Sequence, residues 1–272
     1  MVFGGLPYFL DLLNPNESLT WNVNTLCLKP HALLRHESKK LLEATLKKSP
    51  VYSQILELLA SSAYGMRKAD CREDLGIPQT SFLRAVEDLV KCGYIQEYKD
   101  RYAENKPLRL RLVDPFLLFH YQFLSKLRAD QQEDFNDYKH DVGRYMNWRG
   151  HAFEILCLSH GKQIKAALGI SGVRTSEFSW VSEKKKDGAQ IDLVIERDDG
   201  ITDICEEKFT DTAFSITAEY EGSLLNKVEV FRQESGSKNA MKLVMISAEG
   251  IAGVAHTEHI SRIITLDDLF AS

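Results

Sequence analysis

The stretch QIDLVIERDDGITDICEEKF at residues 190–209 constrains the fold more than any other part of the chain. Its two apolar runs, 191–195 and 201–205, flank the acidic, glycine-containing turn ERDDG. Alternation with a period of two, interrupted by such a turn, is typical of a β-hairpin. Because helical patterns precede and follow this hairpin, the sequence predicts an α/β domain here with a mixed sheet.

Charged residues interrupt both strands of the predicted hairpin. Asp192 lies near the start of the first strand, and the second strand ends in Glu206, Glu207 and Lys208. Since side chains alternate across a strand, Glu206 and Lys208 share one face and Glu207 points to the other. If Asp192 lies at the matching height, its carboxylate meets that of Glu206. Two like charges so close are unfavourable unless a cation lies between them.

A divalent cation resolves this conflict. Magnesium takes oxygen ligands and completes its shell with water and substrate phosphate, so we expect Mg²⁺ or Mn²⁺ to bind Asp192 and Glu206. The ammonium of Lys208 would orient the attacking water or stabilise charge on a phosphate. Glu154, in the apolar helical segment GHAFEILCL, would present a further acid. These residues form a candidate phosphodiester-hydrolysing set. The alternative is a solvated strand edge on which Lys208 neutralises the acids.

The C-terminal block, residues 142–272, also contains further elements around this hairpin. We expect one helix over about 145–168, a strand over about 175–183, a helix over about 217–232 and a buried strand over 241–247. The segment RIITLDDLF closes the domain. The charged run EKKKD at 183–187 is either a solvated turn or a segment that follows a phosphate backbone.

The middle block, residues 49–113, has the element order of a winged helix-turn-helix. Helical patterns at 51–63, 66–75 and 80–92 end at Gly76 and Gly93, and two strands follow around a polar loop. We expect Thr80 or Ser81 to be the N-cap of the third helix. Its inward face is predicted to consist of Phe82, Ala85, Val86 and Leu89.

This winged module is a candidate for DNA binding. Its third helix and loop carry the outward polar and basic residues Gln79, Ser81, Arg84, Lys99, Arg101 and Lys106. Phosphates attract such cations, but Glu87 and Asp88 on the same helix would repel them. The module has ten basic and nine acidic residues between 51 and 113, so a protein-binding or hinge role is equally open.

The remaining segments carry no predicted chemistry. Residues 1–48 show short helical patterns. At 114–141 we expect an aromatic helix that begins at Asp114 and Pro115, with His120 as a packed core residue, and then a polar linker over 129–141.

Composition narrows the function classes. The net charge of −5 argues against a protein that coats nucleic acid over its whole surface. No apolar run reaches the roughly 18 residues of a membrane span. The five scattered cysteines predict buried thiols in a reducing cytoplasm. The chain has no glycine-rich phosphate-binding motif, so we expect no nucleotide site and no ATP hydrolysis by this chain alone.

Several motifs together resemble the C-terminal region of prokaryotic AAA-type P-loop ATPases of the DUF234 family. They are GGLPYFL at 4–10, LVDPFLLFHYQF at 112–123, GHAFEILC at 150–157 and QIDLVIE with CEEKF at 190–196 and 205–209. This resemblance implies a lid remnant at 1–48, a winged helix, and a nuclease-like domain of the PD-(D/E)XK superfamily at 142–272. It implies Glu154, Asp192, Glu206 and Lys208 as the active site. Glu207 departs from the commoner apolar or neutral residue of that motif.

The resemblance also implies a partner. The family's nucleotide-binding motifs precede the lid segment, so an ATPase core is expected in the same or another chain. The abrupt helical start of this chain predicts either a fragment of a longer ATPase or a natural remnant of one. Three functions follow as hypotheses: a Mg²⁺-dependent deoxyribonuclease docked on DNA by the winged helix, a non-catalytic DNA- or protein-binding platform, and a regulatory module of an AAA-type ATPase.

Overall fold

The helical and strand patterns of the sequence are confirmed as a mixed α/β architecture. The structure, a computed structural model, describes residues 1–272 except 47–48, 63–64, 100, 103–106, 183–187 and 272. The chain divides into two units. One contains Met1–Tyr98 and Leu108–Ile155, and the other contains Lys99–Pro107 and Leu156–Ser272.

The first unit begins with short helical elements, as expected. Pro7 begins the first of them, and the Ser18 side chain caps the second by accepting a hydrogen bond from the Trp21 backbone at 3.1 Å. The elements are α1 (Pro7–Asp11), α2 (Leu19–Val23), the π-helix η1 (Asn24–Leu28) and α3 (Glu37–Thr45).

Three helices and two strands follow in the first unit in the predicted order, and a short unpredicted strand, β1, precedes the second helix and pairs with β3. Gly76 ends α5 with φ +61°, and Gly93 follows α6 with φ +74°, so both predicted helix stops are confirmed. The sheet has the strand order β1-β3-β2. The elements are α4 (Pro50–Ala60), β1 (Met66–Arg67), α5 (Lys68–Leu75), α6 (Gln79–Lys91), β2 (Ile95–Lys99) and β3 (Leu108–Leu112).

The amphipathic helix α6 packs its apolar face inward. The predicted set of Phe82, Ala85, Val86 and Leu89 is buried. The predicted N-cap is wrong: α6 already begins at Gln79, and Pro78 occupies the N-cap position without a side-chain cap. A proline there presets the backbone for the helix entry, so no hydroxyl cap is needed.

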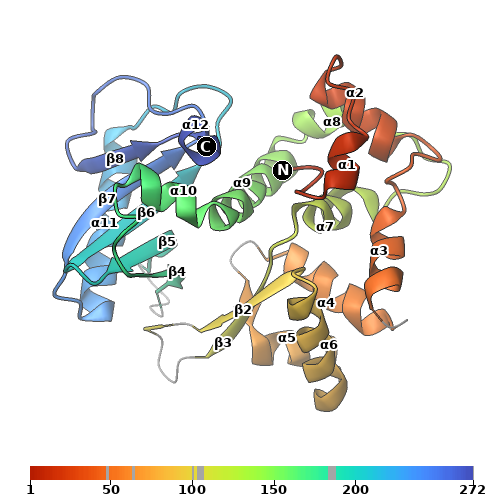
Figure 1. Ribbon diagram of the computed structural model, residues 1–272, viewed down its shortest axis with the longest axis horizontal. Helices are drawn as coiled ribbons and strands as arrows, with labels where there is room; N and C mark the ends of the chain where they lie inside the picture. The colour runs from red at the N-terminus through yellow and green to blue at the C-terminus, as the bar shows by residue number, and fades with distance from the viewer. Residues whose placement is uncertain (47–48, 63–64, 100, 103–106, 183–187, 272) are drawn as a thin grey trace. The chain divides into compact units, whose positions relative to one another are not determined.

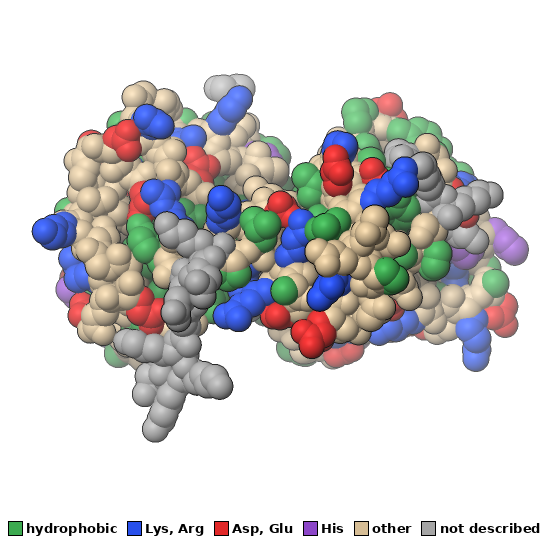
Figure 2. All heavy atoms as spheres, turned by 90° about the horizontal axis from the view of Figure 1, so that it is seen from below, with side chains coloured by type: hydrophobic (Ala, Val, Ile, Leu, Met, Phe, Trp, Pro, Cys, Tyr) green, Lys and Arg blue, Asp and Glu red, His purple; other side chains and the backbone are tan. Residues whose placement is uncertain are grey.

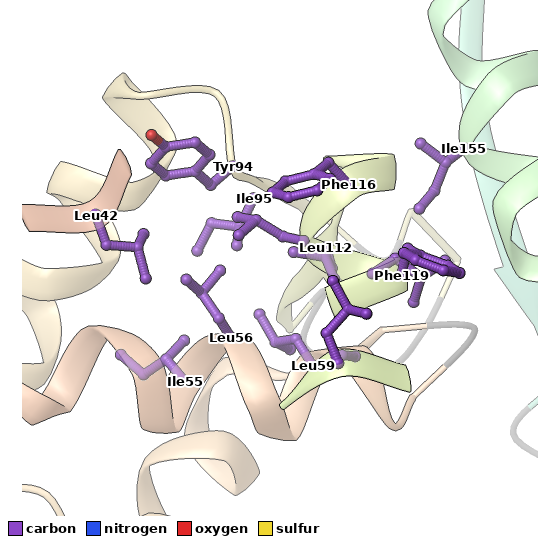
Figure 3. Packing of buried hydrophobic residues seen from close by; sticks show 14 of the residues in the cluster. Leu42, Ile55, Leu56, Leu59, Tyr94, Ile95, Leu112, Phe116, Phe119 and Ile155 are labelled. Atoms are coloured by element: carbon purple, nitrogen blue, oxygen red, sulfur yellow. The ribbon is translucent and has the colours of Figure 1, made fainter. Parts of the chain in front are cut away.

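Figure 3 shows the centre of the first unit's core, where α4, the strands β2 and β3, and α7 contribute side chains. Labelled members that lie within it are Ile55, Leu56, Leu59, Tyr94, Ile95, Leu112 and Phe116. Beside this core, Gly65 enters β1 with φ +64°, and a Cβ built there would lie 2.4 Å from the Leu110 carbonyl oxygen. Only glycine allows that approach.

The aromatic segment after β3 differs from the prediction in two ways. Asp114 caps α7 (Pro115–Phe119) as expected, but the helix then widens into the π-helix η2 (His120–Leu124). The stretch 129–141, predicted as a linker, contains α8 (Phe135–His140). Two aromatic residues of α8, Phe135 and Tyr138, are buried, which gives this polar segment an apolar side.

The helix predicted over 145–168 is broken into two. The long helix α9 (Val142–Ser159) ends before His160, which has φ −110° and ψ 24°, and α10 (Gly161–Ala167) follows. Residues from Leu156 onward group with the second unit. Glycine at the start of α10 weakens helix propagation through this point.

The second unit is built on a five-stranded mixed sheet in the order β4-β5-β6-β7-β8. The first three strands pair antiparallel, and β6, β7 and β8 pair parallel. The strands are β4 (Thr175–Val181), β5 (Gln190–Arg197), β6 (Ile201–Lys208), β7 (Ala240–Ser247) and β8 (Ile260–Ile264). The helices that follow β6 and β8 are α11 (Ala218–Ser235) and α12 (Leu266–Phe270).

Helices lie on both faces of this sheet (Figure 1). On one face, Leu224 and Phe231 of α11 pack against Ile204 and neighbouring strand residues in a shared apolar core. On the opposite face, residues of α10 lie beside strand residues that include Asp203 and Val244. β6 is the middle strand of the sheet, and helices cover both faces of the sheet there.

Candidate functional site

The β5–β6 hairpin brings the two predicted acids together. Gly200, with φ +82°, completes its three-residue turn, and the register pairs Val194 with Ile204. Asp192 and Glu206 each lie two residues beyond that pair, so they face each other on the same side of the sheet. This confirms the prediction that the carboxylates share a face.

Glu206 is buried and surrounded by cationic and hydroxyl donors. The Tyr220 hydroxyl donates a hydrogen bond to Glu206 Oε1 at 2.7 Å, and Lys208 Nζ lies 3.4 Å from the same oxygen. Lys227 Nζ donates to the other oxygen, Oε2. Both oxygens of this buried carboxylate are thus satisfied by the protein itself.

The surroundings of the Asp192 carboxylate stabilise its charge less than those of Glu206 do. Its Oδ2 accepts a hydrogen bond from the backbone N–H of Glu207 at 3.0 Å. Burial, and then the nearby charge of Glu206, raise the pKa of Asp192 to about 6, although Lys227 and Lys208 act in the opposite direction. Two carboxylates placed side by side in this way are a frequent feature of functional sites, because the fold itself gains nothing from the repulsion.

Two residues of this cluster were not predicted from the sequence. Tyr220 and Lys227 come from α11, seven positions apart on one helix face with the buried Leu224 between them. This polar, apolar, polar stripe is the only sequence signal they leave. The Tyr220 ring also lies 5.3 Å from Lys208 Nζ, and burial, together with Glu206, raises the pKa of its hydroxyl.

We call the set Asp192, Glu206, Lys208, Tyr220 and Lys227 the acid–lysine cluster. It contains three of the four predicted catalytic residues. The fourth, Glu154, lies half-buried in the part of α9 that groups with the first unit. Its place beside the acids stays a prediction.

The predicted DNA-binding residues are spread over several environments. Gln79, Ser81 and Arg84 are all exposed on α6. Of the two acids expected to repel phosphates, Asp88 instead accepts a hydrogen bond from the Tyr52 hydroxyl at 2.8 Å. Glu87 forms an ion pair with Lys91. The ion pair with Lys91 offsets the charge of Glu87, whereas the neutral Tyr52 hydroxyl leaves the charge of Asp88 in place.

Lys99, the last residue of β2, and Arg101 in the following loop group with the second unit. Lys99 is exposed, whereas Arg101 lies 3.1 Å from the Glu196 carboxylate and over the Phe178 ring. The carboxylate of Glu196 therefore competes with any phosphate for Arg101. Lys106 and the run 183–187 lie outside the described residues.

Other predicted features have different outcomes. His120 is packed beside Tyr121, and burial lowers the pKa of its imidazole to about 4. Four cysteines are buried as expected, but Cys92 is exposed. In the described part of the chain, no set of three or more His, Cys, Asp or Glu side chains is arranged to hold a metal ion. Among the same residues, no helix has the length and apolar character needed to cross a membrane.

The surface seen in Figure 2 carries both signs of charge. Lys and Arg side chains are interspersed there with Asp and Glu side chains and small hydrophobic patches.

No model of a known protein family matches the chain, and no curated protein matches it.

Proposed function

We propose that the second unit is a Mg²⁺- or Mn²⁺-dependent phosphodiester hydrolase that acts on DNA. The observation that carries this proposal is the juxtaposition of Asp192 and Glu206 on one sheet face with Lys208 3.4 Å from Glu206. Two carboxylates that can hold a divalent cation, with an ammonium beside them, suit metal-assisted phosphate chemistry.

We also propose a fold for each of the two units. The mixed sheet, with Asp192 on one hairpin strand and Glu206 and Lys208 on the next, supports a PD-(D/E)XK nuclease-like domain. The helices α4 to α6 with the sheet β1-β3-β2 support a winged helix that contacts DNA or a protein partner. We further propose, from the sequence motifs, that the chain works with a P-loop ATPase core of the DUF234 type.

Asp192 and Glu206 supply the two carboxylates that a magnesium ion needs, although Glu206 would have to exchange Lys208 or Lys227 for the ion. Asp192 uses Oδ2 for the Glu207 N–H, and a cation between the two carboxylates would remove the repulsion that raises the pKa of Asp192. Magnesium needs only one or two carboxylates when water and phosphate complete its shell. Asp192 and Glu206 would hold the ion, which supplies a Lewis acid and an acidified water when bound.

The lysines of the acid–lysine cluster have separate roles in this proposal. Lys208 is about one-third exposed, so its ammonium can reach a bound phosphate and stabilise the charge that develops there. Lys227 is more enclosed and holds Glu206 in place. Tyr220 fixes the same carboxylate through its hydroxyl. Glu154 stays a further acid that the sequence motif predicts for this set.

Cleavage assays test this function. The chain is incubated with supercoiled plasmid, linear duplex and single-stranded DNA, in Mg²⁺, Mn²⁺ or EDTA, alongside Asp192→Ala, Lys208→Ala and the exposed control Lys238→Ala. We expect metal-dependent cleavage that both site variants reduce by about 10²–10³-fold, as for loss of one charge-stabilising group, while the control keeps its rate. Equal rates in all four proteins would assign the cleavage to a contaminant and overturn the proposal.

A second function has its own supporting observation. Both Glu206 oxygens already have protein partners, so the cluster is satisfied without a metal, as in a non-catalytic DNA- or protein-binding platform that regulates an ATPase. Calorimetric titration with Mn²⁺ separates the two. The hydrolase binds the ion and loses binding in Asp192→Ala, whereas the platform shows no site-specific binding in either protein.

A further inference from the structure

A pocket lies on the other face of the same sheet. Its volume is about 380 Å³, and its walls come from the end of α10 and from strands β5 to β8. Small-molecule sites span roughly 300–1,000 Å³, so this pocket accommodates one small molecule rather than a length of duplex. The acid–lysine cluster contributes no residue to its lining.

Strand register places the pocket's charges on one face. Asp203 pairs with Lys242 across β6 and β7, and Val244 pairs with Arg262 across β7 and β8. Arg197 lies two residues beyond Ile195, which faces Asp203 across β5 and β6. All three cations and the single lining carboxylate therefore converge from neighbouring strands.

The buried carboxylate of Asp203 holds the Arg197 side chain in place. Asp203 is almost fully buried, and its Oδ2 lies 3.4 Å from Arg197 Nη1. Arg197 also pairs with Asp199 of the hairpin turn, with Nε 3.0 Å from Oδ1. The guanidinium is thereby fixed in a position at the pocket wall before any ligand arrives, which lowers the cost of ordering it on binding.

The other two cations are exposed and uncommitted. Lys242 and Arg262 form no ion pair or hydrogen bond with another residue of the described chain. Two carboxylates, Asp203 and Asp199, offset two of the three cations, so these five side chains leave a surplus of one positive charge. A helix end with small residues forms the opposite wall: Ala167 lies there, and Gly169, with φ +72°, has open space where a Cβ would be.

From this geometry we propose that the pocket binds a small phosphate monoester. A dianionic phosphate offers oxygens in several directions, which suits donors converging from three strands better than a planar carboxylate does. Arg262 and Lys242 bind the phosphate at the mouth, Arg197 lies behind them, and the apolar wall of α10 contacts the organic part. This site is independent of the proposed hydrolase function.

Calorimetric titration of the intact chain tests this site. The probes are inorganic phosphate, ribose 5-phosphate, adenosine 5′-monophosphate and adenosine, which lacks the phosphate. We expect the two monoesters to bind and adenosine not to bind. The double variant Lys242→Gln with Arg262→Gln should weaken monoester binding at least about tenfold, as for loss of charge-assisted hydrogen bonds.

Two controls keep the result interpretable. Arg232→Gln removes one exposed charge from α11, on the opposite face, and should bind as the wild type does. Asp192→Asn should also bind normally even though it disrupts the proposed metal site, so the two proposals can fail separately. Monoester binding that is absent, equal to adenosine binding, or unchanged in the double variant overturns the phosphate site. Circular dichroism confirms that each variant is folded.

Discussion

Strand β6 buries Glu206 on one face and both Asp203 and Glu207 on the other, and the surroundings of Glu206 and Asp203 differ. Asp203 is paired with a single guanidinium, that of Arg197. Glu206 has Lys227 as its closest cation but also a second carboxylate, Asp192, beside it. A fold that only has to bury a charge supplies one opposite charge for it. Asp192 and Glu206 lie close enough for each charge to disfavour the other, and this is why we propose the chemistry for that face.

The largest expected effect comes from breaking the ion pair between Asp203 and Arg197. Arg197→Met leaves a buried, uncompensated carboxylate, and we expect a loss of about 3 kcal/mol in the free energy of unfolding. Urea denaturation in EDTA and in Mg²⁺ measures it. Because no metal is expected on this face, the loss should be the same in both buffers, and recovery in Mg²⁺ would contradict the assignment.

The corresponding substitution on the Glu206 face should lose stability in a way that depends on Mg²⁺. Lys227→Met removes one cation from Glu206 but leaves Lys208 and the Tyr220 hydroxyl, so we expect a loss of about 2 kcal/mol in EDTA. Bound Mg²⁺ replaces the missing charge, so stability should return as the ion is titrated. A loss that Mg²⁺ leaves unchanged would place the metal elsewhere.

A smaller effect of opposite sign is expected for Asp192→Asn. Since the folded pKa is raised to about 6, the carboxyl stabilises the fold at low pH and loses that contribution as pH rises through 6. The amide never ionises, so the variant should be more stable than the wild type at pH 8 and equal to it near pH 3. Unfolding curves at both pH values test this. A variant that is less stable at pH 8 would show that the two acids do not repel each other.

The smallest effect concerns the tyrosine. Tyr220→Phe keeps the ring but removes the 2.7 Å hydrogen bond to Glu206, and we expect a loss of about 1 kcal/mol. Ser261→Ala, an exposed change beside the opposite pocket, is the matched control and should stay within about 0.5 kcal/mol. Equal values for the two would show that the hydroxyl does not stabilise Glu206.

The hairpin and its acids were predictable because their signal is local. Alternation fixed which residues share a face, and Gly200 marked the turn. Tyr220 and Lys227 were not found, since α11 meets Glu206 only through packing of a helix that follows the strand. The opposite pocket was missed for the same reason: Arg262 reaches the face of Asp203 only through two strand pairings.

The predicted linker failed for a related reason. The segment around α8 is polar in sequence, and only Phe135 and Tyr138 interrupt it. Their burial depends on aromatic neighbours elsewhere in the chain, such as Trp148, whose ring centroid lies 6.4 Å from that of Phe135, and Phe123, at 4.7 Å from Tyr138. Periodicity within the segment does not contain that information.

The central position of β6 in the sheet determines how the acid–lysine cluster loses its structure when the unit unfolds. Its backbone is bonded on both sides, by β5 and by β7, so its amides should exchange with solvent only when the whole unit opens. Fraying of an edge strand cannot reach Glu206. Heat inactivation and unfolding of the unit should therefore coincide, with no folded but inactive species between them.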